Sequence, residues 1–223
     1  MDTPNESIRD TAFWQTRATT YELLAFSFRY PDADLVQVLT SGEWTEAVCE
    51  VAQVCTLELP VGWQDELSCY EQANPEQLIH TLRTEATRLF VGTPSPAVSP
   101  FEGVQRAQTD GVQALLFVNP HSMEVERFIK DCGLGRPEHT NEPLDHVATE
   151  LEFLQWLCML EAGISQAPVG IESPEEGWSG IHDRFLEEHA RVWMPSFAEQ
   201  VSKETREVFY GVAAGLLGAV IVR

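Results

Sequence analysis

Hydrophobic residues recur at helical spacing along most of this chain of 223 residues. In the stretch 7–30, Trp14, Ala18, Tyr21 and Ala25 fall on one face of a helix. The same periodicity predicts helices over residues 34–39, 43–57, 63–70, 75–90, 123–132 and 202–222. Because no segment shows several alternating strands and no repeat is visible, we expect an all-α, single-domain fold of about ten helices over residues 1–223.

The run Asn141-Glu142-Pro143-Leu144-Asp145-His146 leads into an apolar segment, residues 147–160. A proline suits the first turn of a helix, so we expect this helix to begin near Pro143. Its apolar residues cover most of the circumference, which is typical of a helix buried in the middle of a domain. The pattern therefore predicts a buried central helix with Glu142, Asp145 and His146 crowded at its N-terminus.

Two long connections interrupt the helical pattern. Prolines 94, 96 and 100 exclude regular structure from residues 91–103, and two prolines and three glycines mark residues 165–180. Both connections are candidate hinges. Between them, residues 112–118 are apolar and fit either a short strand or a buried turn of helix.

Near the C-terminus, Phe185, His189, Trp193 and Phe197 recur every four residues and indicate one helix face. Pro195 lies inside this run, and we expect it to kink or split the helix.

Composition narrows the choice of partner. The formal net charge is −21, from 35 acidic and 14 basic residues. Such a charge repels phosphate backbones and anionic lipids, so basic peptides or basic protein segments are the expected partners, and nucleic acid and membrane surfaces are not. The N-terminus has neither a basic start nor an apolar core, so we expect a cytoplasmic protein. Residues 208–222 are apolar but short of the roughly 18 to 20 residues needed to span a bilayer.

Chemical motifs are scarce. The five cysteines form no CxxC pair, and no phosphate-binding, dinucleotide, zincin or hydrolase motif is present, so we expect neither a cofactor nor a metal. His182-Asp183 leaves open an HD-type metal-dependent phosphohydrolase. The simpler interpretation is that His182 is a surface residue that caps the next helix.

Asp145, His146 and Glu150 allow two interpretations. In the first they form a capping and salt-bridge set, in which Glu150, one turn after His146, raises the pKa of the histidine. In the second they belong to a recognition edge, where Glu142 and Asp145 accept guanidinium groups beside a groove. The spacing alone favours the first.

The run Glu142-Pro143-Leu144-Asp145-His146 resembles the E-P-x-D-H signature of the TorD/DmsD/NarJ family of redox-enzyme maturation chaperones. Further similarities occur in the family's order along the chain: Tyr21-Glu22-Leu23-Leu24, Leu89-Phe90-Val91-Gly92, Pro100-Phe101-Glu102, and the run from Phe185 to Phe197 with Phe209-Tyr210. The family's P-x-E loop normally continues with a serine and then an aromatic residue. Here Gly103 and Gln105 occupy those positions.

The resemblance implies a cytoplasmic all-helical chaperone without catalytic activity. It would bind the twin-arginine signal peptide, or an N-terminal segment, of the apo form of a molybdenum-containing oxidoreductase until the cofactor is inserted. The peptide-binding residues it implies are Glu142, Pro143, Asp145, His146, Glu150, Tyr21, Leu24 and Trp156. Some members form domain-swapped dimers, so either a monomer or such a dimer is expected. An assembly factor that binds the folded oxidoreductase is the remaining alternative.

Overall fold

The computed structural model describes residues 9–59, 61–111, 119–135 and 143–223. Within these ranges the chain forms helices and no β-strand, as the periodicity predicts. The helices are α1 (Thr11–Phe28), α2 (Ala33–Ser41), α3 (Glu43–Val54), α4 (Trp63–Glu71), α5 (Pro75–Ala86), α6 (Glu102–Thr109), α7 (Pro120–Asp131), α8 (Val147–Glu161), α9 (Gly177–Phe185), α10 (Arg191–Glu204) and α11 (Val208–Ile221), with two π-helical turns, η1 (Thr87–Val91) and η2 (Leu186–Ala190).

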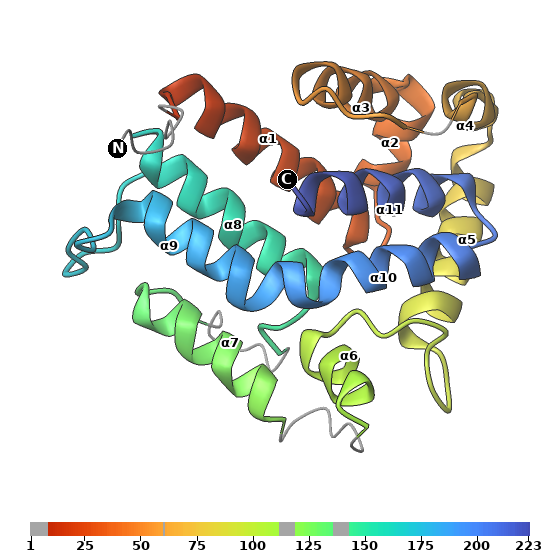
Figure 1. Cartoon of the computed structure of the whole chain (residues 1–223). Helices are drawn as coiled ribbons and strands as arrows, with labels where there is room; N and C mark the ends of the chain where they lie inside the picture. Colours follow the sequence, from red (N-terminus) through yellow and green to blue (C-terminus); the bar gives the residue numbers. More distant parts are fainter. Residues whose placement is uncertain (1–8, 60, 112–118, 136–142) are drawn as a thin grey trace, which may run out of the picture.

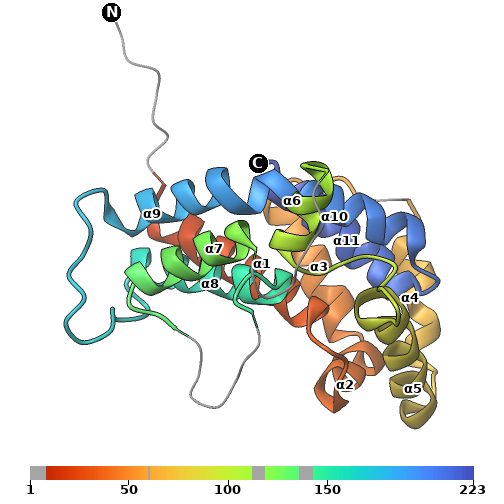
Figure 2. The same ribbon diagram turned by 90° about the horizontal axis from the view of Figure 1, so that it is seen from below.

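Helix α8 is the buried central helix that the apolar run predicts. It lies between α1 and α9 (Figure 1), and its Leu151, Leu154 and Leu157 have no exposed surface. Seen from below, α7 covers α8 and α9, and α6 lies against α10 (Figure 2). Helices α2 to α5 gather at the other end of the molecule. One contiguous apolar core connects these layers.

The prediction of a split at Pro195 is wrong, because α10, the last part of the rod α9–η2–α10, passes through this residue without a break. The irregularity lies earlier, in the π-turn η2. A π-turn holds one residue more than an α-helical turn. It therefore keeps residues spaced by four on one face, and Phe185, His189, Trp193 and Phe197 are all buried.

Several predicted boundaries shift. The stretch predicted as one helix from residue 202 divides, because α10 ends at Glu204 and α11 begins at Val208. Between them the backbone N–H of Arg206 donates to the buried Glu85 at 2.7 Å, an interaction that residue spacing does not reveal. Helix α6 begins at Glu102, inside the predicted loop 91–103, and most of it lies where the periodicity predicts no element. Residues 112–118 lie outside the described ranges.

His182 is buried rather than a surface cap, with 1% of its surface exposed. Its Nε2 lies 3.2 Å from the hydroxyl of Tyr21, and its Nδ1 lies 3.0 Å from Asp183. Asp183 also pairs with Arg9 at 2.7 Å. Burial alone would raise the pKa of Asp183, but the hydrogen bonds from His182 and Arg9 lower it to about 2. This cluster ties α1 to α9.

Within the described ranges, no group of three His, Cys, Asp or Glu residues could hold a metal ion, and His182 and Asp183 are therefore not part of such a group there. Among the helices the structure describes, none is long and apolar enough to cross a bilayer.

Replacing Tyr21 by Phe should lower the free energy of unfolding by about 1–3 kcal/mol, because the buried His182 Nε2 loses its partner. Urea unfolding measures the loss. Tyr30→Phe is the matched control, since that tyrosine is 55% exposed and its hydroxyl lies 3.3 Å from Thr87 Oγ1. Equal losses in the two variants would contradict a structural role for the Tyr21–His182 contact.

Candidate functional site

The site is organised by two short segments that pair across the chain. Phe101 and His146 form an isolated antiparallel bridge. Glu102 N donates to Asp145 O, and Val147 N donates to Pro100 O, both at 2.9 Å. The pairing holds His146 in an extended conformation after a turn at residues 144–145, so α8 begins at Val147 rather than near Pro143.

His146 is the N-cap of α8. Its Nδ1 accepts a hydrogen bond from Ala148 N at 3.1 Å, and its ring packs edge-on against Phe101. Burial lowers the pKa of His146 to about 4, so the expectation that Glu150 raises this pKa is wrong. A neutral imidazole is the form that can accept the capping hydrogen bond.

Asp145 connects three elements from a buried position, with 1% of its surface exposed. Its Oδ2 accepts hydrogen bonds from Gly103 N at 3.0 Å and from Ser122 Oγ at 2.6 Å. Burial raises the pKa of this carboxyl group. Asp145 precedes the helix and therefore does not cap the first turn of α8. It fastens α6 and α7 to the junction.

Gly103 occupies a position where the family has a serine, and the local packing explains the difference. A Cβ at this position would overlap Ser122 Oγ and lie 3.0 Å from Asp145 Oδ2. Here the hydroxyl of Ser122 fills the space that a side chain at position 103 would occupy. Gln105, which stands where an aromatic residue is usual, is buried and donates to Ser99 O at 2.9 Å.

Two further buried carboxyl groups lie close to Asp145. Glu150 and Glu102 both have no exposed surface, and Trp193 Nε1 donates to Glu150 Oε2 at 3.0 Å. Burial first, and then the charge of Glu102, raise the pKa of Glu150 well above its ordinary value. The protonated form of Glu150 is therefore favoured, and its proton can bridge to Glu102. Helices α6 and α8 meet through this acid pair.

Glu102 also faces two basic side chains. Arg106 Nη1 lies 2.7 Å from Glu102 Oε1, and His189 Nδ1 lies 3.0 Å from the same oxygen. The arginine is more accessible than its partner, because 22% of its side chain is exposed and none of the side chain of Glu102. The π-turn η2 places His189 on this side of the rod.

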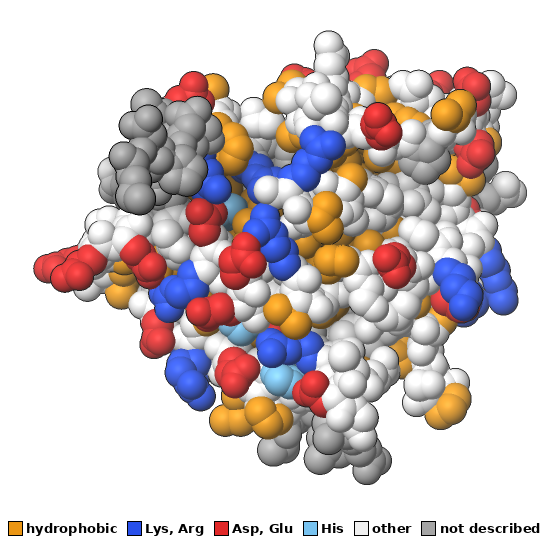
Figure 3. Space-filling model, viewed as in Figure 1, with side chains coloured by type: hydrophobic (Ala, Val, Ile, Leu, Met, Phe, Trp, Pro, Cys, Tyr) orange, Lys and Arg blue, Asp and Glu red, His pale blue; other side chains and the backbone are white. Residues whose placement is uncertain are grey.

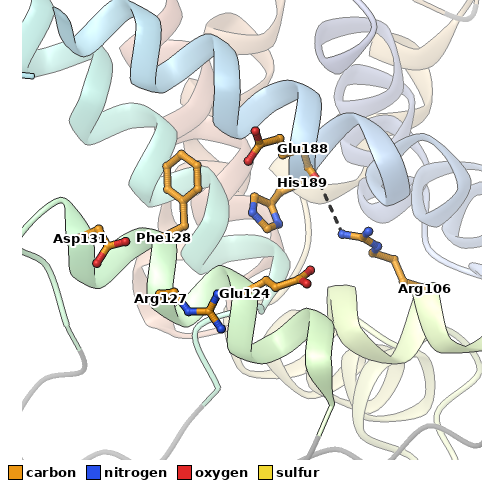
Figure 4. A pocket seen from close by; sticks show the side chains of 7 residues that line it. All are labelled: Arg106, Glu124, Arg127, Phe128, Asp131, Glu188 and His189. Atoms are coloured by element: carbon orange, nitrogen blue, oxygen red, sulfur yellow. Dashed lines mark hydrogen bonds between the residues drawn. The ribbon is translucent and has the colours of Figure 1, made fainter. Parts of the chain in front are cut away.

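Arg106 and His189 form part of the wall of a surface cleft of 410 Å³ between α6, α7 and η2. Figure 4 shows the side chains that line it: Arg106, Glu124, Arg127, Phe128, Asp131, Glu188 and His189. The cleft therefore combines carboxylates, arginines and one aromatic ring, and the buried carboxyl groups lie behind Arg106 and His189.

The residues implied by the family resemblance differ in their accessibility. Tyr21, Leu24, Asp145 and Glu150 are buried, so in the described conformation they offer no surface to a peptide. Pro143 and His146 are half-buried, as is Trp156, which packs against Phe153 and Trp178. Glu142 lies outside the described residues. Their peptide contacts stay a prediction.

The sequence analysis missed the importance of Arg106, Ser122 and His189. Glu102 entered only as part of a loop motif, although it is a fully buried carboxyl group with two basic partners. The one available signal was the place of His189 within the apolar run spaced by four, where a polar residue on a buried face requires a partner.

By its fold the chain is an all-helical protein with a solved structural neighbour. It superposes on the crystal structure of a candidate redox enzyme maturation protein from Archaeoglobus fulgidus with a TM-score of 0.51 and 20% identity, over 90% of this chain and 91% of that one.

The chain belongs to the nitrate reductase delta subunit family, whose model matches residues 45–199. This is the group of TorD/NarJ-type maturation chaperones that the E-P-x-D-H signature predicts.

Two relatives come from known reductase systems. The chain is 26% identical to the perchlorate reductase assembly chaperone of Dechloromonas aromatica, over 87% of this chain and 81% of the relative. It is 30% identical to the selenate reductase assembly chaperone of Thauera selenatis, over 65% and 70%. These relatives are named as assembly chaperones and not as enzymes, in agreement with the expectation of no catalytic activity.

Exchanging the hydroxyl group between positions 103 and 122 tests the packing at Asp145. Gly103→Ser alone should lower the free energy of unfolding by about 1–3 kcal/mol, because the new side chain overlaps Ser122. The double variant Gly103→Ser/Ser122→Ala should recover most of this loss, since a serine hydroxyl again faces Asp145. Urea unfolding of the two single variants and the double variant gives the coupling energy. Additive losses would show that Ser122 does not replace the family serine.

Glu150→Gln should change how stability depends on pH. The pKa of Glu150 is raised by folding, so its contribution to stability is complete below its unfolded pKa and is lost as the pH rises through the folded pKa. The stability of the wild type relative to Glu150→Gln should therefore fall from about pH 5 to about pH 8, by at most about 1.4 kcal/mol per pH unit. Urea unfolding over this range measures the difference, and a difference that is constant with pH would contradict the raised pKa.

Proposed function

We propose that this protein is a cytoplasmic chaperone for a molybdenum-containing oxidoreductase of the DMSO, TMAO or nitrate reductase type, and that it binds the arginine-bearing N-terminal segment of that enzyme. The observation that carries this proposal is membership of a family whose relatives are named as reductase assembly chaperones. The cleft between α6, α7 and η2 is the place where we expect the segment to bind.

The chemistry of the cleft suits a segment that carries arginines. Asp131 and Glu188 are exposed, and neither side chain makes an ion pair with any residue the structure describes. Two carboxylates of this kind can receive guanidinium groups through paired, charge-assisted hydrogen bonds. Phe128 between them offers a ring face, which already holds Arg184 at 4.7 Å from its centre.

This function needs binding and release but no chemical step. The chaperone would hold the apo oxidoreductase until the molybdenum cofactor is inserted and then release the twin-arginine signal peptide for export. In this scheme Asp145 and Glu150 act by positioning α6 and α8 behind the cleft. Pro143 and His146 lie where the segment before α8 meets the segment before α6. The connections at residues 91–103 and 165–180 remain our candidate hinges for a domain-swapped dimer.

Isothermal calorimetry with a synthetic leader peptide, and with the same peptide carrying Lys-Lys in place of Arg-Arg, tests the proposal. We expect the arginine peptide to bind about tenfold more tightly, because guanidinium groups pair with carboxylates in bidentate fashion. Asp131→Asn/Glu188→Gln should weaken binding by about tenfold.

The matched control is Glu46→Gln/Glu50→Gln on α3, which removes the same charge from exposed carboxylates at the other end of the molecule. This control should bind within about twofold of the wild type, because distant surface charges are screened. Equal losses in both double variants would indicate a net-charge effect. Failure of both peptides to bind, with binding of the folded oxidoreductase, would favour an assembly factor that recognises the finished enzyme.

A further inference from the structure

We propose that Glu102 is a binding residue for a guanidinium group of the partner, and that Arg106 occupies this position in the free protein until the partner displaces it. The inference rests on the proposed function and identifies a receptor group within the same cleft. It assigns a ligand class, an arginine side chain, to a carboxylate that is closed off in the free chain.

The first step of the argument is the asymmetry of the Glu102–Arg106 pair. Glu102 has no exposed surface, whereas Arg106 lines the cleft and is 22% exposed. The pair therefore has its acid inside and its base at the boundary with the cleft. The arginine can turn into solvent by side-chain rotation, but the glutamate cannot follow it.

The second step is the excess of acid behind Arg106. Glu102, Asp145 and Glu150 are all buried, and Asp145 Oδ1 and Glu150 Oε1 accept no hydrogen bond from the residues that the structure describes. Among the described residues, Arg106 and His189 are the basic side chains that face Glu102 from the cleft side. A buried carboxylate that loses its charged partner is destabilised, so Glu102 is most stable with a guanidinium beside it, whether or not a partner is bound.

The third step concerns what can replace Arg106. An incoming guanidinium restores the same charge and the same planar fork of donors, so the exchange leaves no buried charge unpaired. A lysine ammonium offers a single point charge and fits this position less well. The remaining contact of Arg106 is weak, since its Nη1 lies 3.4 Å from Glu188 O, the contact drawn in Figure 4.

The consequence is selectivity for partners that carry arginine. A segment must supply an arginine that competes with Arg106, and general positive charge is not sufficient. A second arginine in the segment then meets the exposed carboxylates of Asp131 and Glu188 on the cleft wall. A segment with two adjacent arginines therefore binds more tightly than a segment with one, because one arginine exchanges with Arg106 while the other adds a new contact.

Arg106→Gln tests this inference by removing the competitor. With the synthetic Arg-Arg peptide as probe, calorimetry should show binding about tenfold tighter than that of the wild type. Arg127→Gln is the matched control. Arg127 lines the same cleft and makes no ion pair within the described residues, so the control removes the same charge without uncovering Glu102. It should change binding by no more than about twofold.

Glu102→Gln/Arg106→Gln removes both partners and should abolish the gain while keeping a neutral pair in the fold. A second measurement uses the unmodified chain labelled with ¹⁵N-arginine. The Nε–H signal of Arg106, assigned with the Arg106→Gln variant or, if that chain does not fold, with Arg106→Lys, should shift to the position of a solvent-exposed arginine when the peptide is added.

Three results would overturn the inference: tightening by Arg106→Gln no greater than that by Arg127→Gln, weaker binding by Arg106→Gln, or an Arg106 signal that the peptide leaves unchanged. Weaker binding in both single variants would instead indicate that the two arginines hold an anionic group. If the wild type binds neither the Arg-Arg nor the Lys-Lys peptide, the proposed function fails first, and the two failures are thereby distinguishable.

Discussion

Three carboxyl groups buried where α6, α8 and the α9–α10 rod meet impose the main constraint on this fold. Glu102, Asp145 and Glu150 have almost no exposed surface, and each comes from a different segment. Such a cluster is stable only if hydrogen-bond donors, protons or cations surround it. The chain supplies them from the backbone amide of Gly103 and from the side chains of Ser122, Trp193, His189 and Arg106. The elements around the cleft are fixed in place by this requirement.

The burial of these carboxyl groups gives the E-P-x-D-H signature a structural role. A carboxylate in a conspicuous motif suggests a group presented to a ligand. Asp145 instead holds Gly103 N and Ser122, and His146 caps α8 in its neutral form. These contacts determine where α6 begins, and α6 carries Glu102 and Arg106 to the cleft. In the described structure the side chains of Asp145 and His146 therefore hold α6 and α8 in place, and the side chains that line the cleft lie outside the motif.

Residue spacing predicted the fold well and the site only in part. Apolar periodicity is a local property, and it located α1, α8 and most other helices to within a few residues. The start of α8 was placed four residues too early because the pairing of Phe101 with His146 joins segments 45 positions apart. Gly103, where the family has a serine, also depends on a distant residue. The hydroxyl that fills the space beside it belongs to Ser122 on another helix. The signals at the site are therefore non-local.

Negative charge spread over the surface attracts cationic segments in general, so selective binding of one segment requires a specific site. No Lys or Arg occurs between Arg29 and Arg83, whereas on the face seen in Figure 3 basic side chains are spread among acidic ones. The general negative field attracts any cationic segment and weakens with salt. Exchange at Glu102 replaces one paired arginine by another, so the buried charge is the same before and after and salt affects the step little. In the proposed mechanism, attraction thus comes from the whole surface, and discrimination comes from a single buried carboxylate.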